Sequence, residues 1–318
     1  MPVRSKLIGF GGYLPDKIVT NADLSTRVDT SDEWIRTRTG IAQRHIAGPD
    51  DSAASMGEAA ARAALDYAGV DVETVDAIIV ATATPDQPFP AVATRIQGAL
   101  GLKRGFAFDI SAACSGFIYA LAVADSFIQT KQARRVLVIG SEVYSRILDW
   151  SDRTTCVLFG DGAGAVLLDV AEPESESAIL STHLHSDGAH ADILYVEREG
   201  QDGPSLRMNG REVFRHAVTK LAEVVDEALN AHGMTGKDVQ WLVPHQANLR
   251  IIDGVAKKLA LPQERVIVTV DRHANTSAAS IPLALNEAVR DGRVKKGEIV
   301  LLEAFGGGLT WGAALLRL

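Results

Sequence analysis

An internal repeat constrains the fold of this chain more than any other feature of its sequence. When the 318 residues are aligned with themselves at a shift of 164, three blocks coincide in the same order. Single matches between such common residues carry little weight, but three blocks at one offset indicate a duplication. The matched blocks are Ala64-Leu65 with Ala228-Leu229, Ala120-Leu121 with Ala284-Leu285, and residues 136–138 with 300–302.

Both copies predict the same alternation of helices and strands. Each begins with a helix (residues 59–68 and 218–231) and a short apolar strand (77–81 and 241–243), followed by a small-residue helix and two strands. Such alternation favours α/β layers with buried strands. An acidic, proline-containing stretch separates the copies, so we divide the chain into residues 1–172 and 173–318. We expect the halves to pack as one pseudo-symmetric body with its site between them.

The repeat is not exact near the end of the first copy. The shift falls to 148 where residues 164–168 match 312–316, so the first half carries about sixteen extra residues. They lie roughly between Gly140 and Asp161, just before the last strand of that half.

Composition excludes several classes of function. Lys and Arg number 32 against 40 Asp and Glu, a net charge of −8, whereas nucleic-acid binding requires a basic surface. No apolar run reaches the roughly 18 residues of a membrane span, and the N-terminus lacks a secretory signal. We therefore expect a cytoplasmic protein that binds neither nucleic acid nor membrane. The two cysteines form no CxxC motif and have no histidine pair at metal-binding spacing, so neither a disulfide framework nor a metal site is expected.

Cys114 is the candidate nucleophile. It lies where an apolar, strand-like segment runs into an alanine-rich helical one, and its neighbours are small enough to admit a substrate. A thiol at a helix N-terminus meets the positive end of the helix dipole, so we expect its pKa to be lowered. Cys156 lies in a segment predicted as a strand and is interpreted as a core residue.

The second copy supplies polar partners for this thiol. At the shift of 164, Cys114 falls opposite Ala278, and Asn275 stands three residues earlier; Ala81 falls opposite His245. An imidazole N–H and a carboxamide N–H can both donate to one oxygen and stabilise an enolate or oxyanion. Equally, His245 could act as a base that activates Cys114, as in cysteine hydrolases. The residues alone leave both alternatives open.

Four segments resemble the thiolase superfamily and, within it, the β-ketoacyl-acyl-carrier-protein synthase III family. They are AACSGF around Cys114, VPHQANLRI around His245, NTSAASIP from Asn275, and the terminal LEAFGGGLTWG. Residues 13–15, 21–24 and 29–41 extend the match, so the resemblance covers essentially the whole chain. The Cys, His, Asn combination differs from the Cys, His, His set of the related elongating synthases.

The resemblance implies a thiolase-like fold, in which two βαβαβ halves form a five-layered αβαβα body, and a homodimer without a cofactor. Cys114 would take an acyl group, by default acetyl, from acyl-CoA. Malonyl-acyl carrier protein would then lose CO2, and its enolate, held by His245 and Asn275, would attack the acyl group. The backbone N–H groups of Cys114 and Gly307 would form the oxyanion hole. This reaction would initiate type II fatty acid synthesis.

The resemblance also implies binding residues. Trp34 and Arg153 would sandwich the CoA adenine, with Thr30 and Arg38 at the entrance. Phe305 would shape the malonyl site, and Phe89 would reach across the dimer interface to cap the acyl pocket. The family often has Gly where Thr154 stands and another polar residue where Arg211 stands. Further substrate contacts would come from Gly210, Phe214, Ala247 and Asn248.

An acidic carrier protein would need a basic landing surface on this acidic chain. In residues 248–260 the helical pattern separates basic residues from an apolar face formed by Ile252, Val255 and Leu259. An ordinary solvated face would give the same pattern, but the resemblance favours docking. The residues assigned to docking are Arg211, Arg215, Gln246, Arg250, Lys257 and Lys258.

Three other functions fit part of the sequence. A related acyltransferase of secondary metabolism could use the same triad on other primers. A Cys-His thioester hydrolase would use His245 as the base. A non-catalytic scaffold is disfavoured because all three triad residues are present. The run Gly306–Gly308 fits neither GxxxxGK[ST] nor GxGxxG, so it does not predict a phosphate-binding loop.

Overall fold

Two mixed sheets with helices on and between them form the body of the protein. The computed structural model describes residues 3–172, 174–200 and 203–318. The first sheet has the order β1-β7-β6-β4-β5, and the second has the order β11-β12-β13-β8. The first comprises β1 (Ser5–Tyr13), β4 (Ala77–Ala81), β5 (Phe106–Ile110), β6 (Arg135–Glu142) and β7 (Gly162–Val170); the second comprises β8 (Ala178–Ser186), β11 (Trp241–Pro244), β12 (Ile299–Gly306) and β13 (Thr310–Arg317).

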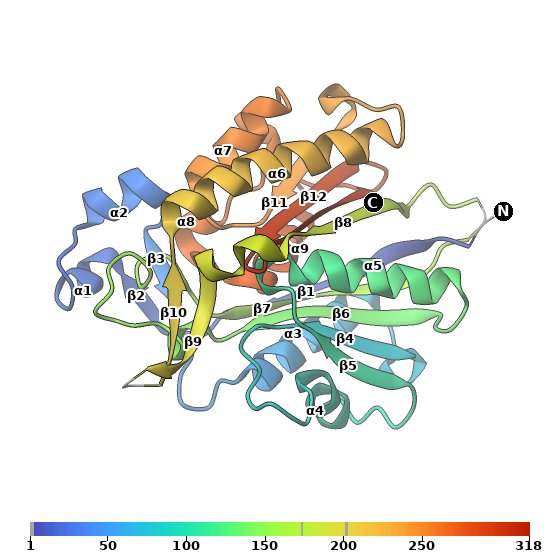
Figure 1. Cartoon of the computed structure of the whole chain (residues 1–318). Helices are drawn as coiled ribbons and strands as arrows, with labels where there is room; N and C mark the ends of the chain where they lie inside the picture. Colours follow the sequence, from blue (N-terminus) through green and yellow to red (C-terminus); the bar gives the residue numbers. More distant parts are fainter. Residues whose placement is uncertain (1–2, 173, 201–202) are drawn as a thin grey trace.

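The helices form three further layers, as Figure 1 shows. α5 (Gly116–Gln129) and α9 (Ser280–Arg290) lie between the two sheets and share one apolar core with both. α3 (Ala53–Ala68) and α4 (Val92–Ala99) cover the outer face of the first sheet. α6 (Gly210–Asn230) and α7 (Leu249–Lys258) cover the outer face of the second. The expected αβαβα order is therefore confirmed.

The two halves repeat the same plan. β4, α5, β6 and β7 of the first half correspond in order to β11, α9, β12 and β13 of the second. In the first half β6 pairs parallel with β4 and antiparallel with β7. In the second half β12 pairs parallel with β11 and antiparallel with β13. β4 is buried along its whole length, as expected of a parallel strand covered on both faces. The division at residues 172 and 173 stays a prediction, because residue 173 lies outside the described residues.

Small residues allow α3 to pack closely on the first sheet. Ser52 caps the helix through the backbone N–H of Ser55, and Gly69 ends it in the left-handed conformation with φ 63°. A Cβ added at Gly11 of β1 would lie 2.1 Å from the carbonyl oxygen of Ala60. Glycine is therefore required where this strand meets the helix backbone.

The remaining elements surround one end of the body. A two-stranded sheet, with two helices between its strands, precedes α3, and a hairpin of β9 and β10 leads into α6. These elements are β2 (Ile18–Thr20), α1 (Asn21–Ser25), α2 (Asp32–Thr39), β3 (Gln43–His45), β9 (Leu194–Gly200), β10 (Gly203–Met208) and α8 (Val270–His273).

The extra residues of the first half form turns between β6 and β7. Cys156 lies in these turns, so its assignment to a strand is wrong, although its side chain is fully buried as expected. The Asp152 carboxylate accepts hydrogen bonds from the backbone N–H of Thr154 and the hydroxyl of Thr155. Such local side-chain bonds favour turns over a strand in an apolar segment.

Candidate active site

Cys114 lies in a single 3-10 turn (Ala113–Ser115) between β5 and the start of α5, and its side chain is buried. Ala113 has a φ of 44°, an unfavourable conformation for a residue with a Cβ. Gly306 approaches from β12, where an added Cβ would lie 2.7 Å from the Cys114 backbone nitrogen. Backbone strain and close approach both occur at the predicted nucleophile, which is typical of functional sites.

The expected lowering of the Cys114 pKa is wrong. Burial raises the pKa of the thiol to about 12, and the charge of the Glu142 carboxylate adds to this effect. Hydrogen bonds with Ser277 and Tyr144 lower the pKa but do not offset burial. Removing the thiol from water penalises the thiolate more than the helix N-terminus favours it. The folded protein therefore holds Cys114 as the protonated thiol at neutral pH.

His245 follows β11 directly, and its backbone N–H donates to the Glu303 carbonyl oxygen of β12 at 2.8 Å. The ring is buried, with Nδ1 2.7 Å from the hydroxyl oxygen of Ser280. Burial lowers the pKa of His245 to about 3, so the imidazole is neutral at physiological pH. Nε2 is also buried and has no partner within the described residues.

Asn275 is held between the two halves. Its backbone N–H donates to Leu158 at 2.9 Å, and its carbonyl oxygen accepts from Gly160 at 3.0 Å. The side-chain Oδ1 accepts the backbone N–H of Ser277 at 2.8 Å. Because Oδ1 is occupied in this way, the Nδ2 amino group remains as the donor of this side chain.

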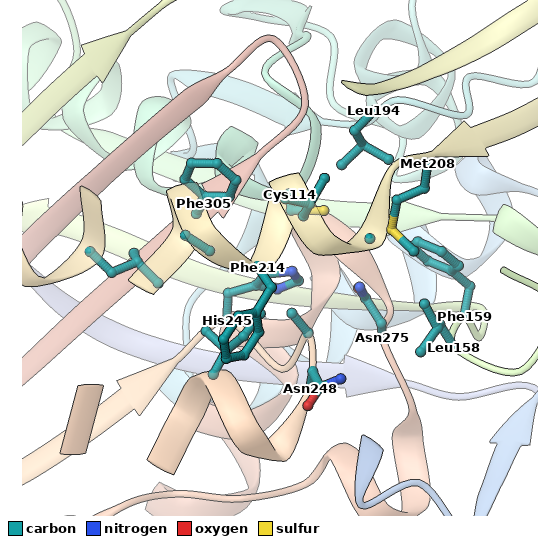
Figure 2. Close-up of a pocket in the computed structure, with 16 residues that line it drawn as sticks. Cys114, Leu158, Phe159, Leu194, Met208, Phe214, His245, Asn248, Asn275 and Phe305 are labelled. Carbon is teal, nitrogen blue, oxygen red and sulfur yellow. The ribbon is translucent and has the colours of Figure 1, made fainter. Parts of the chain in front are cut away.

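These three side chains line one mostly apolar pocket with a cavity volume of about 150 Å³ (Figure 2). Figure 2 shows them reaching the pocket from different elements. The sequence also predicted five other lining residues: Gly210, Phe214, Ala247, Asn248 and Phe305. The pocket thus brings together the thiol of one half and the imidazole and carboxamide of the other.

Sequence reasoning missed several apolar residues of this wall. Val213, Ala217 and Leu221 of α6 follow one another at helical spacing on the face that carries Phe214. That spacing was visible in the sequence and could have identified them. The sequences of the β9–β10 hairpin and of the turns between β6 and β7 have no helical spacing that could identify their pocket residues. The other missed residues are Leu158, Phe159, Leu194, Met208 and Ile251.

The predicted adenine site lies outside this pocket. The guanidinium carbons of Arg38 and Arg153 lie 4.5 and 5.3 Å from the ring centroid of Trp34. Arg153 also donates to the Asp29 carbonyl oxygen at 2.8 Å. At this separation Arg153 stacks on Trp34 itself, so its exposed side chain must move to admit a purine between them. Thr30 has a buried hydroxyl without a partner among the described residues.

The predicted docking residues divide into two groups. Arg250, Lys257 and Lys258 are exposed on α7, and Arg211 and Arg215 are exposed on α6. Lys258 lies 3.5 Å from Asp226, and Arg215 is ion-paired with Glu212, so these two charges are partly offset.

Gln246 does not belong to this surface, and its assignment to docking is wrong. The side chain is fully buried, and Nε2 donates to the carbonyl oxygens of Pro244 and Ile267 at 2.8 and 3.0 Å. Oε1 accepts the backbone N–H groups of Thr269 and Val270 at 2.8 and 3.0 Å. Four backbone partners thus hold the amide inside the fold, next to His245.

Phe89 is 83% exposed and lies between β4 and α4. Gly307 follows β12, and a Cβ there would lie 2.8 Å from the Leu194 carbonyl oxygen. Within the described residues, no group of His, Cys, Asp or Glu could hold a metal ion. Nor do the described helices include one that is long and apolar enough to span a membrane.

Comparison with known proteins agrees with this architecture. The family model of 3-oxoacyl-[acyl-carrier-protein] synthase III matches residues 108–188, and that of its C-terminal domain matches residues 229–318. The chain is 63% identical over 317 residues to the β-ketoacyl-[acyl-carrier-protein] synthase III of Acidiphilium cryptum, covering 99% of both chains. It is 62% identical over 326 residues to that of Rhodospirillum centenum, with both chains fully covered.

Solved structures give the same result. The crystal structure of 3-oxoacyl-[acyl-carrier-protein] synthase III from Aquifex aeolicus superposes with a TM-score of 0.94 at 50% identity, covering 99% of this chain and 100% of that one. A priming β-ketosynthase of the R1128 polyketide pathway superposes with a TM-score of 0.93 at 38% identity, covering 100% and 98%. Sequence, fold and full-length identity therefore agree that this chain belongs to the 3-oxoacyl-[acyl-carrier-protein] synthase III family of acyltransferases.

Proposed function

We propose that this protein condenses acyl-CoA, with acetyl-CoA as the default primer, with malonyl-acyl carrier protein to give a 3-ketoacyl-acyl carrier protein. The observation that carries this proposal is the meeting of Cys114, His245 and Asn275 in one buried, largely apolar pocket. A thioester on Cys114 presents the electrophile, and two N–H donors from the opposite half stabilise the enolate beside it. The step would begin type II fatty acid synthesis, in the cytoplasm and without a cofactor.

The first half-reaction moves the acyl group to Cys114. The sulfur attacks the acyl carbonyl, its proton is lost, the C–S bond to CoA breaks, and the CoA thiolate takes up one proton. The exchange of one thioester for another consumes no proton overall. The developing oxyanion is assigned to the backbone N–H groups of Cys114 and Gly307, whose neighbour Gly306 packs directly against Cys114.

The second half-reaction makes the new C–C bond. The malonyl thioester loses CO2, and the electrons of the broken C–C bond form an enolate whose oxygen accepts from His245 and Asn275. The enolate carbon then attacks the acyl-Cys114 carbonyl, and Cys114 leaves to regain a proton. Buried Phe305 and the apolar pocket wall keep carboxylate and enolate from water, which strengthens the two donors. We assign no charged catalyst to this step because burial keeps His245 neutral.

A thiol hydrolase would need His245 to hydrogen-bond to Cys114 as its base. Instead, Nε2 of His245 has no hydrogen-bond partner among the described residues and Nδ1 contacts Ser280, while hydrogen bonds with Ser277 and Tyr144 act on the thiol. This arrangement favours condensation over hydrolysis.

Substrate entry is assigned to the surface above the pocket. Trp34, Arg38 and Arg153 would hold the CoA adenine, Thr30 would contact the entrance, and the pantetheine would pass Gly210, Phe214, Ala247 and Asn248. The exposed cations of α6 and α7 would bind the acidic carrier, led by Arg250, whose guanidinium carbon lies 5.6 Å from the Phe214 ring centroid.

A homodimer would complete the acyl pocket. β5 is the edge strand of the first sheet, and its Phe106 is exposed within an aromatic cluster with Phe108 and Phe127. An unpaired, aromatic edge is a site for adding a strand of a second copy. Phe89, exposed on the same half, would then reach the partner's pocket.

The test is to incubate the protein with radiolabelled acetyl-CoA, isolate the acyl-enzyme and add malonyl-acyl carrier protein. The proposal predicts label on Cys114 and then a labelled ketoacyl product two carbons longer. Release of free labelled acid without that product would overturn it. Parallel reactions with isobutyryl-CoA and octanoyl-CoA define the primer, and Cys114→Ala is the matched control for acylation.

A further inference from the structure

The hydroxyl of Ser280 contacts the catalytic imidazole on the side away from its free nitrogen. Ser280 is the first residue of α9, and its Oγ lies 2.7 Å from Nδ1 of His245, with both side chains buried. The same oxygen accepts the backbone N–H of Gln246 at 3.3 Å. His245 also lines the pocket, and its Nε2 is the ring nitrogen without a partner among the described residues.

These contacts decide which ring nitrogen carries the proton. A serine hydroxyl has one proton and two acceptor positions. If Nδ1 donated to Ser280, the hydroxyl would accept two N–H groups, and its own proton would need a further acceptor. Among the described residues the hydroxyl makes no hydrogen bond to such an acceptor. If the hydroxyl donates to Nδ1, all three groups are satisfied. A buried neutral ring in this arrangement carries its proton on Nε2.

The duplication offers an independent comparison. At the shift of 164, His245 corresponds to Ala81 and Ser280 corresponds to Gly116. The first-half pair is also in contact, because a Cβ added at Gly116 would lie 3.1 Å from the Cβ of Ala81. The correspondence extends to the backbone, where Ala113 and its equivalent Ser277 both have positive φ values, 44° and 50°.

Each half therefore has a contact between the residue at the end of a strand and the first residue of the following central helix. In the half that carries the thiol it is built from two residues without polar side chains. In the other half both positions carry hydrogen-bonding groups, and they bond to each other. The histidine and the serine thus form a unit placed on a shared scaffold.

We propose that Ser280 is a positioning residue that holds His245 as an Nε2–H donor, and so assigns it to the enolate oxygen rather than to the Cys114 proton. The proposal rests on the proposed condensation for its kinetic readout only. Its structural readout, the tautomer of His245, is independent of any reaction.

The first experiment uses the unaltered protein labelled with 15N-histidine. Long-range 1H–15N spectra distinguish the two neutral tautomers, and His245→Gln identifies the His245 signals among those of eight histidines. The proposal predicts the Nε2–H tautomer with no titration between pH 5 and 8. An Nδ1–H tautomer, or a mixture of the two, would overturn it, even if every substitution at Ser280 failed to fold.

The second experiment separates the half-reactions in Ser280→Ala. Acylation by acetyl-CoA should stay within about twofold, whereas CO2 release from malonyl-acyl carrier protein should fall at least about tenfold. Ser280→Thr retains a hydroxyl and should recover most of the loss. Ser5→Ala is the control. Ser5 lies on β1, is also buried, and donates a hydrogen bond to Asp125 at 2.6 Å.

An unchanged rate of decarboxylation in Ser280→Ala would contradict the proposal, as would equal losses in both half-reactions. Failure of the unaltered protein to form a ketoacyl product would refute the proposed function instead, while leaving the tautomer measurement to decide the role of Ser280.

Discussion

Burial determines the charge of the key side chains at the residue scale. It raises the pKa of Cys114, lowers that of His245, and raises those of the carboxyls of Glu142 and Glu303 to about 7 and 8. A charged group is costly where water is excluded and no opposite charge compensates it. The sequence placed Cys114 at a helix N-terminus but could not show how deeply the fold would bury it. The direction of its pKa shift was therefore predicted wrongly.

Glu303 provides a test of this balance that does not involve the reaction. Its folded-state pKa lies above its ordinary value of 4.5, so the folded protein retains a proton that the unfolded chain loses. The stabilisation is present below pH 4.5 and is lost as pH rises toward 8. In Glu303→Gln this loss is absent, so the unfolding free energy of the variant relative to the parent should rise by a few kcal/mol between pH 5 and 8.

Urea unfolding at both pH values measures this difference. His245 and His273 destabilise the fold as pH falls below 6.5, but they are common to both proteins and cancel. A difference between variant and parent that stays constant with pH would show that Glu303 is not a proton-retaining carboxyl.

At the scale of elements, the buried Gln246 amide ties the end of β11 to the segment before α8. The motif VPHQANLRI indicated the histidine and the following helix correctly, since the apolar spacing of α7 is visible in the sequence. It could not distinguish an exposed polar side chain from a buried one, because a glutamine looks the same in both settings until its backbone partners are known. The sequence therefore predicted a docking role for Gln246, whereas its side chain has a structural role.

Gln246→Ala should destabilise the protein by about 2–4 kcal/mol, because two buried N–H groups and two buried carbonyls lose their partner. Gln263→Ala is the matched control, since Gln263 is exposed and donates to Asp253 at 3.0 Å, and it should change the stability by less than about 0.5 kcal/mol. Denaturant melts give both values. Equal stability of the two variants would refute the structural role.

The basic face of α7 makes a second prediction at this scale. Arg250→Glu should raise the KM for malonyl-acyl carrier protein at least about tenfold and leave acylation by acetyl-CoA unchanged. Lys258→Glu should have a smaller effect, since Asp226 already offsets its charge. Steady-state rates at low and high salt are the measurement, because added salt should reduce the difference. An Arg250→Glu effect on acylation alone would exclude this docking surface.

At the scale of the whole molecule, the duplication determined most of what the sequence could predict. The 164-residue shift predicted the repeated helix and strand order of the two halves and the opposition of Cys114 to His245 and Asn275, and the family resemblance predicted the five layers. The segments without a counterpart in the other half were predicted least well: the turns around Cys156 and the hairpin that supplies Leu194 and Met208 to the pocket. Their conformation depends on tertiary contacts and local turn bonds rather than on a repeated pattern.

The proposed reaction divides the chemistry between the two halves of the molecule. In that proposal the first half supplies the thiol that carries the acyl group, and the second supplies the donors that stabilise the enolate. Because the donors make no hydrogen bond to the thiol among the contacts of the described residues, acylation and decarboxylation should be separable by mutation.

The most direct test of this division measures 14CO2 release from labelled malonyl-acyl carrier protein by pre-acylated His245→Ala and Asn275→Ala in a single turnover. We expect both variants to accept the acyl label on Cys114 at close to the parent rate. We expect decarboxylation to be slower by about 10²–10³ in each, the usual effect of removing one oxyanion donor. Loss of acylation in both variants, or decarboxylation at the parent rate, would contradict the account.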